Sequence, residues 1–210
     1  MKKLVIIMFA AVLLAAAPAW ALPLALESNP ATKFQQTENS PCVIGDKSCN
    51  NGGFAYTSAT GPAGGVLATY ELKSPTYDVI AGTGVSAPYG IPTSFRIGYD
   101  INYAGGQGYE TLEYFKMFVN EVLTDQYVGP TNVSVQANGN GFSDAIFSGF
   151  SPLSVGDKVY FMAKWSNDTD GMEEFFIIPS EGATPVPEPM SMLLLGLGLV
   201  GLAGVGRFRK

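Results

Sequence analysis

Histidine is absent from all 210 residues, and its absence excludes several kinds of site. Ser-His-Asp and Cys-His triads need an imidazole as general base, and many zinc sites need one as a ligand. A pair of carboxylates can hydrolyse glycosides without histidine. The candidates of the right type are Asp100, Glu113, Glu173 and Glu174. Because charged side chains in an acidic domain are mostly solvated, we expect no enzyme activity and keep a carboxylate-pair hydrolase as the alternative.

Positive charge is scarce in the central part of the chain. From Leu22 to Pro185 there are seven basic and seventeen acidic residues, so this segment carries a net charge of −10. A surface of this sign repels phosphate backbones and anionic lipids, and we expect no nucleic-acid partner. The segment of about 164 residues is long enough for one domain with its own core.

The first residues have the pattern of a secretory signal peptide. Lys2 and Lys3 are followed by an uncharged apolar run, Leu4 to Ala17, and then by Ala19-Trp20-Ala21. This order is typical of a positive region, a hydrophobic region and an A-x-A site for signal peptidase, at which Ala19 and Ala21 are the small residues. We therefore expect residues 1–21 to be removed on export and the mature chain to begin at Leu22.

Only two cysteines are present, Cys42 and Cys49. In an exported chain two nearby cysteines predict a disulfide. By loop entropy a ring of this length contributes roughly 2.5 kcal/mol, which is enough to hold a local loop. A metal-binding or reactive thiol is the less favoured interpretation, since no histidine accompanies the pair.

The C-terminal part contains a long apolar run without charged residues. Met190 to Gly206 carries no charge, and as a helix at about 1.5 Å per residue it reaches roughly 26 Å, the lower limit for a bilayer core of about 30 Å. Arg207, Arg209 and Lys210 follow and are expected to stop transfer on the cytoplasmic side. Pro187-Glu188-Pro189 precedes the run. The pattern predicts a transmembrane helix with a proline-rich segment on its outer side.

This order of Pro-Glu-Pro, short Gly- and Leu-rich helix and basic tail resembles the PEP-CTERM sorting signal of Gram-negative bacteria that make exopolysaccharide. The resemblance covers residues 185–210. It implies recognition by an exosortase, a membrane cysteine protease that cuts near Pro187, Glu188 and Pro189 and passes the protein from the inner membrane to the cell surface. The alternative is a permanent single-pass anchor with a proline-rich linker.

Residues 22–184 have the composition of an all-β domain. Phe and Tyr are frequent, and Gly, Pro, Asn and Ser divide the chain into short segments. Strands are predicted at 66–73, 77–81, 95–103, 112–119, 122–127, 132–137, 145–150, 158–165 and 173–178. Asn120-Glu121 is expected to be a hairpin turn, and residues 110–123 compete as a helix. The spacing favours an antiparallel two-sheet β-sandwich, jelly-roll-like, between the signal peptide and the sorting helix.

One acidic cluster remains open to two interpretations. It consists of Asn167, Asp168, Asp170, Glu173 and Glu174. Carboxylates in flexible geometry suit calcium, and Asp168 and Asp170 are the expected ligands. The same Asp and Gly residues also suit a simple turn. No other cofactor is expected.

Two functional classes follow for this exported chain. The first is a non-catalytic cell-surface or matrix protein associated with exopolysaccharide or with surface assembly. The second is a carbohydrate-active sandwich that either binds sugars through Tyr, Trp and Asn on one face or hydrolyses them with a carboxylate pair.

Overall fold

The computed structural model describes residues 21–61, 67–102, 108–136, 141–168 and 171–180, and every regular element in them is a β-strand. The all-β prediction is confirmed. The strands are β1 (Leu22–Pro23), β2 (Ala25–Ser28), β3 (Cys42–Gly45), β4 (Thr57–Ser58), β5 (Ala68–Lys73), β6 (Tyr77–Ile80), β7 (Gly90–Pro92), β8 (Phe95–Asp100), β9 (Tyr109–Val119), β10 (Val122–Ser134), β11 (Ala145–Ser148), β12 (Lys158–Asp168) and β13 (Glu174–Pro179).

Several predicted features lie outside the described residues. They are Ala19 at the signal-peptide site, Asp170, the Pro187-Glu188-Pro189 motif, and the basic residues Arg207, Arg209 and Lys210. Among the described residues, no helix has the length and apolar character needed to span a membrane.

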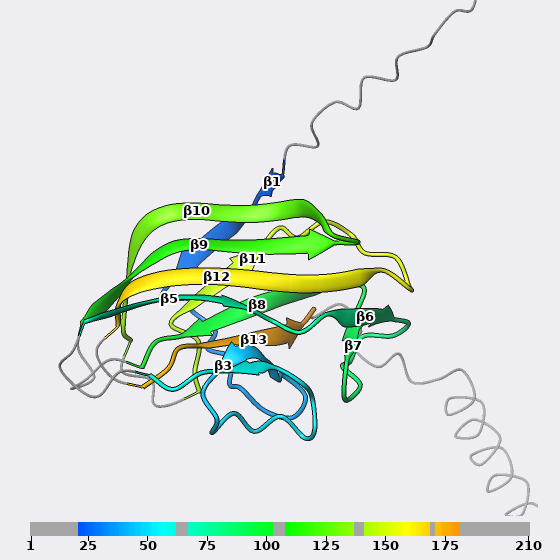
Figure 1. Cartoon of the computed structure of the whole chain (residues 1–210), viewed down its shortest axis with the longest axis horizontal. Coiled ribbons are helices and arrows are strands. Elements are labelled where there is room, and N and C mark those ends of the chain that lie inside the picture. Colours follow the sequence, from blue (N-terminus) through cyan, green and yellow to red (C-terminus); the bar gives the residue numbers. More distant parts are fainter. Residues whose placement is uncertain (1–20, 62–66, 103–107, 137–140, 169–170, 181–210) are drawn as a thin grey trace, which may run out of the picture.

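The strands form two sheets that lie one over the other (Figure 1). The first sheet has the order β1-β10-β9-β12-β6-β7, with β5 also paired to β12, and the second has the order β2-β11-β8-β13-β3-β4. The long central pairs are antiparallel, but β1/β10, β3/β4 and β6/β7 are parallel. The prediction of purely antiparallel sheets is therefore wrong, and the jelly-roll-like order is not confirmed. Each parallel pair includes a strand of two or three residues that no tight hairpin joins to its partner, so no turn imposes an antiparallel direction.

The β9–β10 hairpin confirms the predicted turn at Asn120-Glu121. Both turn residues have positive φ, 50° and 67°, as a type I′ hairpin requires. Residues 110–119 are strand, so the helical alternative is wrong. The two strands predicted at 122–127 and 132–137 are one strand, β10, whose register shifts between Val128 and Thr131. Gly129 and Pro130 lie in this bulge, which explains why the sequence looked interrupted there.

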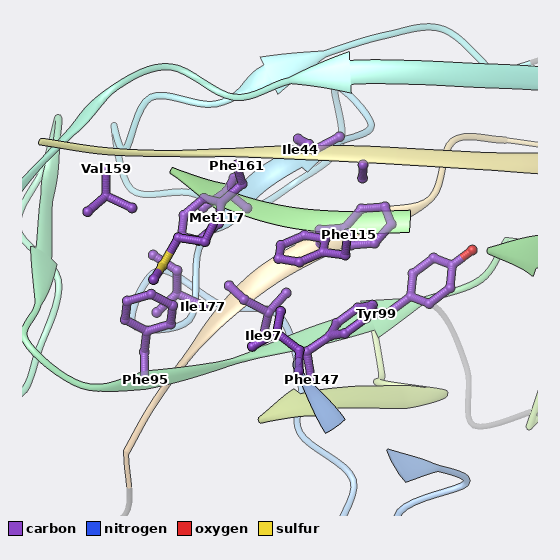
Figure 2. Close-up of a cluster of buried hydrophobic side chains, with 14 of the residues drawn as sticks. Ile44, Phe95, Ile97, Tyr99, Phe115, Met117, Phe147, Val159, Phe161 and Ile177 are labelled. Carbon is purple, nitrogen blue, oxygen red and sulfur yellow. The ribbon is translucent and has the colours of Figure 1, made fainter. Parts of the chain in front are cut away.

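Aromatic side chains from both sheets meet in the core (Figure 2). Phe115 of β9 stacks on Phe147 of β11 with ring centroids 4.6 Å apart, and it also stacks on Phe175 of β13 at 5.5 Å. Phe95 of β8 meets Phe161 of β12 edge-on at 5.7 Å. Because these rings join the two sheets, their burial contributes to the hydrophobic free energy that holds the sheets together.

The predicted disulfide between Cys42 and Cys49 is present. It closes the loop after β3, at the edge of the second sheet. Gly45 lies inside this loop, and a Cβ atom on it would come within 2.6 Å of Cys49 Sγ. The loop can therefore fold over the disulfide only with glycine at this position.

Candidate metal centre and surface hollow

Three acidic side chains from different strands meet inside one end of the sandwich. On β9, Glu110 points to the same side as the core residue Leu112, because strand residues alternate between faces. Asp168 ends β12 after a register shift that turns it inward, and Glu173 immediately precedes β13. Carboxylate oxygens of Glu110, Asp168 and Glu173 lie within 4.8 Å of one another, and all three side chains are fully buried. We call these three residues the carboxylate cluster.

Neutral donors hold the carboxylate cluster in place. The indole Nε1 of Trp165 donates to Asp168 Oδ2 at 3.2 Å and to Glu173 Oε2 at 3.1 Å. The hydroxyl of Tyr99 donates to Glu110 Oε2 at 3.3 Å, and the backbone N–H of Asn102 donates to Glu173 Oε1 at 3.3 Å. These donors fix the direction of the carboxylates without supplying a full positive charge.

The electrostatics of the carboxylate cluster are unfavourable for three ionised groups. In the part of the chain that the structure describes, the one ion pair joins Lys158 to Asp78, far from this end. Burial, followed by the hydrogen bond and the charge of Glu110 and then by those of Asp168, raises the pKa of Glu173 well above its ordinary value, and burial also raises the pKa of Glu110. Glu110 Oε1 is buried and accepts no hydrogen bond within the described residues. The arrangement is suited to a bound cation or to shared protons.

Two further buried acids accept hydrogen bonds from the backbone of the loops beside the cluster. Asp144 accepts hydrogen bonds from the backbone N–H groups of Ile101 and Gln136, at 2.9 and 2.7 Å. Asp100 accepts one from the N–H of Gly141 at 2.7 Å. Burial raises the pKa of Asp100 to about 8. Because their oxygens bind backbone groups of neighbouring segments, these two side chains have a structural role.

The structure divides the acidic residues that the sequence grouped. Asp168 and Glu173 belong to the carboxylate cluster, whereas Asp170 lies outside the described residues. Glu174 points the other way, toward the Cys42–Cys49 disulfide, whose bonded sulfurs are not available to a metal. Glu113 lies on the outer face, where it accepts a hydrogen bond from Ser166 Oγ at 3.0 Å.

Sequence reasoning missed Glu110, which supplies the third carboxylate. The sequence feature that indicates it is its spacing, because a residue two positions before Leu112 lies on the same inward face of the strand. The strand was predicted to begin only at Leu112, so Glu110 was not assigned to a face. Extending the alternation by one pair of residues would have placed it in the core.

A hollow of about 320 Å³ lies on the outer surface of the first sheet, beside the carboxylate cluster. No charged side chain lines it. The lining residues are Leu67, Ala68, Thr69, Tyr109, Thr111, Asn132, Ser166 and Asn167. They come from β5, β9, β10, β12 and the residue before β5, and Tyr109 is 46% exposed. We call this feature the polar hollow.

The polar hollow and the carboxylate cluster use neighbouring residues of the same two strands. Tyr109 precedes Glu110 on β9, and Asn167 precedes Asp168 on β12. Asn167 has a positive φ of 72° at the register shift of β12 and donates through Nδ2 to the carbonyl of Tyr109 at 2.9 Å. One bulge therefore turns Asn167 outward to the hollow and Asp168 inward to the cluster.

Comparison with known families concerns the C-terminal segment. Residues 185–210 match the family described as the PEP-CTERM protein-sorting motif. The chain carries a PEP-CTERM sorting motif. This motif marks an exported protein that passes through the membrane and is sorted by an exosortase. No curated protein and no solved structure matches the chain.

β13 runs from the carboxylate cluster to the opposite end of the sandwich. The carboxylate cluster lies at the start of β13, and the strand ends at Pro179, six residues before the motif begins. At about 3.3 Å per residue, β13 crosses roughly 20 Å between its two ends. The last described strand therefore ends on the side of the sandwich opposite to the cluster (Figure 1).

Proposed function

We propose that this PEP-CTERM protein is a non-catalytic cell-surface or matrix protein whose sandwich binds neutral polysaccharide through the polar hollow. The observation that carries the proposal is the chemistry of the hollow, which combines an exposed tyrosine ring with amide and hydroxyl groups and no charge. Sugar rings stack on aromatic faces while their hydroxyls need polar partners. The resemblance to the sorting signal makes exopolysaccharide the expected source of such a ligand.

The groups around Tyr109 leave hydrogen-bonding capacity for a ligand. Asn167 uses Nδ2 for the carbonyl of Tyr109, so its Oδ1 remains an acceptor. Asn132 Oδ1 accepts from Thr111 Oγ1 at 3.0 Å, so the Asn132 amide N–H groups remain donors. Donors and acceptors held in place beside an exposed ring favour recognition of a sugar over a purely apolar ligand.

A binding role is favoured over hydrolysis by the position of the acids. The three acids of the carboxylate cluster are fully buried. Of the candidate acids, Asp100, Glu173 and Glu174 are buried as well, and none of them lines the polar hollow. A glycosidase needs two carboxylates flanking the bond that it cuts.

The direct test is a glycan array probed with the mature protein and with two tyrosine variants. Tyr109→Ala removes the ring of the polar hollow, whereas Tyr89→Ala removes a ring of similar exposure, 44%, beside β7. We expect Tyr109→Ala to weaken binding of neutral oligosaccharides roughly threefold to tenfold, which corresponds to an aromatic contact of about 0.5–1.5 kcal/mol. Tyr89→Ala should bind as the wild type does.

Two outcomes contradict the proposal. Binding that both variants lose equally would place the ligand elsewhere, and an array without any signal would remove the glycan-binding role. Release of reducing sugar from a bound oligosaccharide would support the hydrolase instead.

A further inference from the structure

We propose that the carboxylate cluster of Glu110, Asp168 and Glu173 binds a calcium ion inside the end of the sandwich. The site differs from the pair expected from the sequence, since it takes Glu110 from β9 and Glu173 from the start of β13 in addition to Asp168. It joins strands of both sheets through one ion. The inference is independent of whether the polar hollow binds sugar.

The spacing of the carboxylate oxygens fits one shared ion. Calcium binds oxygen at about 2.4 Å, so two oxygens on the same ion lie no more than about 4.8 Å apart. One oxygen from each of the three side chains meets this limit. Calcium takes six to eight oxygens, and bidentate carboxylates or backbone carbonyls complete such a shell.

Glu110 supplies a second, independent observation. Its side chain is fully buried, and Oε1 has no hydrogen-bond partner among the residues that the structure describes. A buried oxygen without a partner costs free energy unless something binds it. The other oxygen, Oε2, is held by the Tyr99 hydroxyl at 3.3 Å, which fixes the direction of the carboxylate. An ion between the three acids would satisfy Oε1.

The chemistry of the donors selects calcium among common metals. The chain has no histidine, and its two cysteines are bonded to each other, so the imidazole and thiolate ligands typical of zinc and copper sites are missing. Three carboxylates form a hard, all-oxygen site. Magnesium keeps several of its waters, whereas a buried site fully enclosed by protein oxygens suits calcium, which is also abundant outside the cell.

Trp165 makes the site directly observable. It is one of two tryptophans in the chain, and the other, Trp20, falls within the predicted signal peptide. Its Nε1 is bonded to both Asp168 and Glu173. A terbium ion in the cluster would therefore be excited through Trp165 and would emit, and calcium would displace it. The experiment uses the mature exported protein after chelation and dialysis.

We expect sensitised terbium emission from the wild type and its loss on titration with calcium at about 0.1–1 mM, the range of weak extracellular sites. Glu110→Gln keeps the shape of the side chain and removes one ligand charge, and it should weaken terbium binding about tenfold or more. Glu27→Gln removes an exposed acid on β2 as the matched control and should leave binding unchanged.

A thermal melt separates loss of a ligand from misfolding. In the metal-free state Glu110→Gln should melt at or above the wild-type temperature, because it removes a buried like charge, and calcium should no longer raise its melting temperature. Emission that calcium fails to displace, equal emission from Glu110→Gln and wild type, or a wild-type melting temperature unchanged by calcium would each overturn the site. The last result would leave three carboxyl groups that share protons.

Discussion

The indole Nε1 of Trp165 lies 3.1 Å from Glu173 Oε2, and this hydrogen bond ties the end of β12 to the start of β13. The same N–H also reaches Asp168. Since β12 belongs to the first sheet and β13 to the second, one side chain connects the two layers through buried carboxylates.

Replacing Trp165 with phenylalanine removes this donor. Two buried carboxylates then lose a partner, so we expect the free energy of unfolding to fall by about 2–3 kcal/mol. Urea unfolding followed by circular dichroism measures the change. Tyr70 stacks on Trp165 with ring centroids 5.5 Å apart, and Tyr70→Phe is the control because it keeps this ring contact. A loss below about 0.5 kcal/mol would show that the hydrogen bonds contribute little.

Stability should fall as pH rises in the presence of a chelator. Burial raises the pKa of Asp100 from 3.8 to about 8, and the neighbouring Asp144 and Glu174 add to the shift. Its stabilising contribution is complete below about pH 4 and is lost as pH rises through about 8. Between these two pKa values, one carboxyl group lowers the free energy of unfolding by up to about 1.4 kcal/mol per pH unit. Asp100→Asn should flatten the profile between pH 5 and 8, and a wild-type profile that rises over this range would contradict the burial argument.

The Cys42–Cys49 disulfide should stabilise its own loop, and the two β-sheets should form without it. Replacing both Cys42 and Cys49 with alanine opens a loop of about eight residues, and we expect a loss of roughly 2.5 kcal/mol with the β-sheet circular dichroism unchanged. Gly45→Ala should destabilise the wild type, because its Cβ would clash with Cys49 Sγ, and should cost less once the disulfide is absent. Equal costs in the two backgrounds would show that the clash is relieved elsewhere.

The β9–β10 turn offers a stabilising change. Glu121 has a φ of 67°, a conformation that costs a non-glycine residue about 1 kcal/mol. Glu121→Gly should therefore raise the free energy of unfolding by about 0.5–1 kcal/mol, measured by thermal or urea unfolding. Gly156 already has a positive φ of 96°, so Gly156→Ala should change stability in the opposite direction.

The sequence predicted the long strands because their aromatic and β-branched residues form continuous segments. Asn120-Glu121 could be assigned to a turn because it separates two such segments. The short strands β1, β2, β3, β4 and β7 were missed, since two to four residues carry too little periodicity to distinguish strand from loop. Their pairing depends on contacts with distant strands.

The candidate site was predictable in part. Asp168 and Glu173 were identified because they are close in sequence. Glu110 was not, because it lies 58 residues before Asp168 and reaches it only through the pairing of β9 with β12. The outward position of Asn167 depends on the register shift in β12, which no residue of the strand signals. The polar hollow crosses four strands and therefore exists only in the folded sheet.

The central claim is delivery of this domain to the cell surface, and mass spectrometry of the mature C-terminus tests it most directly. In an exosortase-bearing host we expect no peptide containing Arg207 to Lys210, and the protein should be found at the surface or in the medium. Replacing Pro187, Glu188 and Pro189 with alanine should leave the tail uncut and the chain in the membrane fraction, because the protease would lose its motif. A wild-type mature protein that retains Arg207 to Lys210 in the inner membrane would contradict the account.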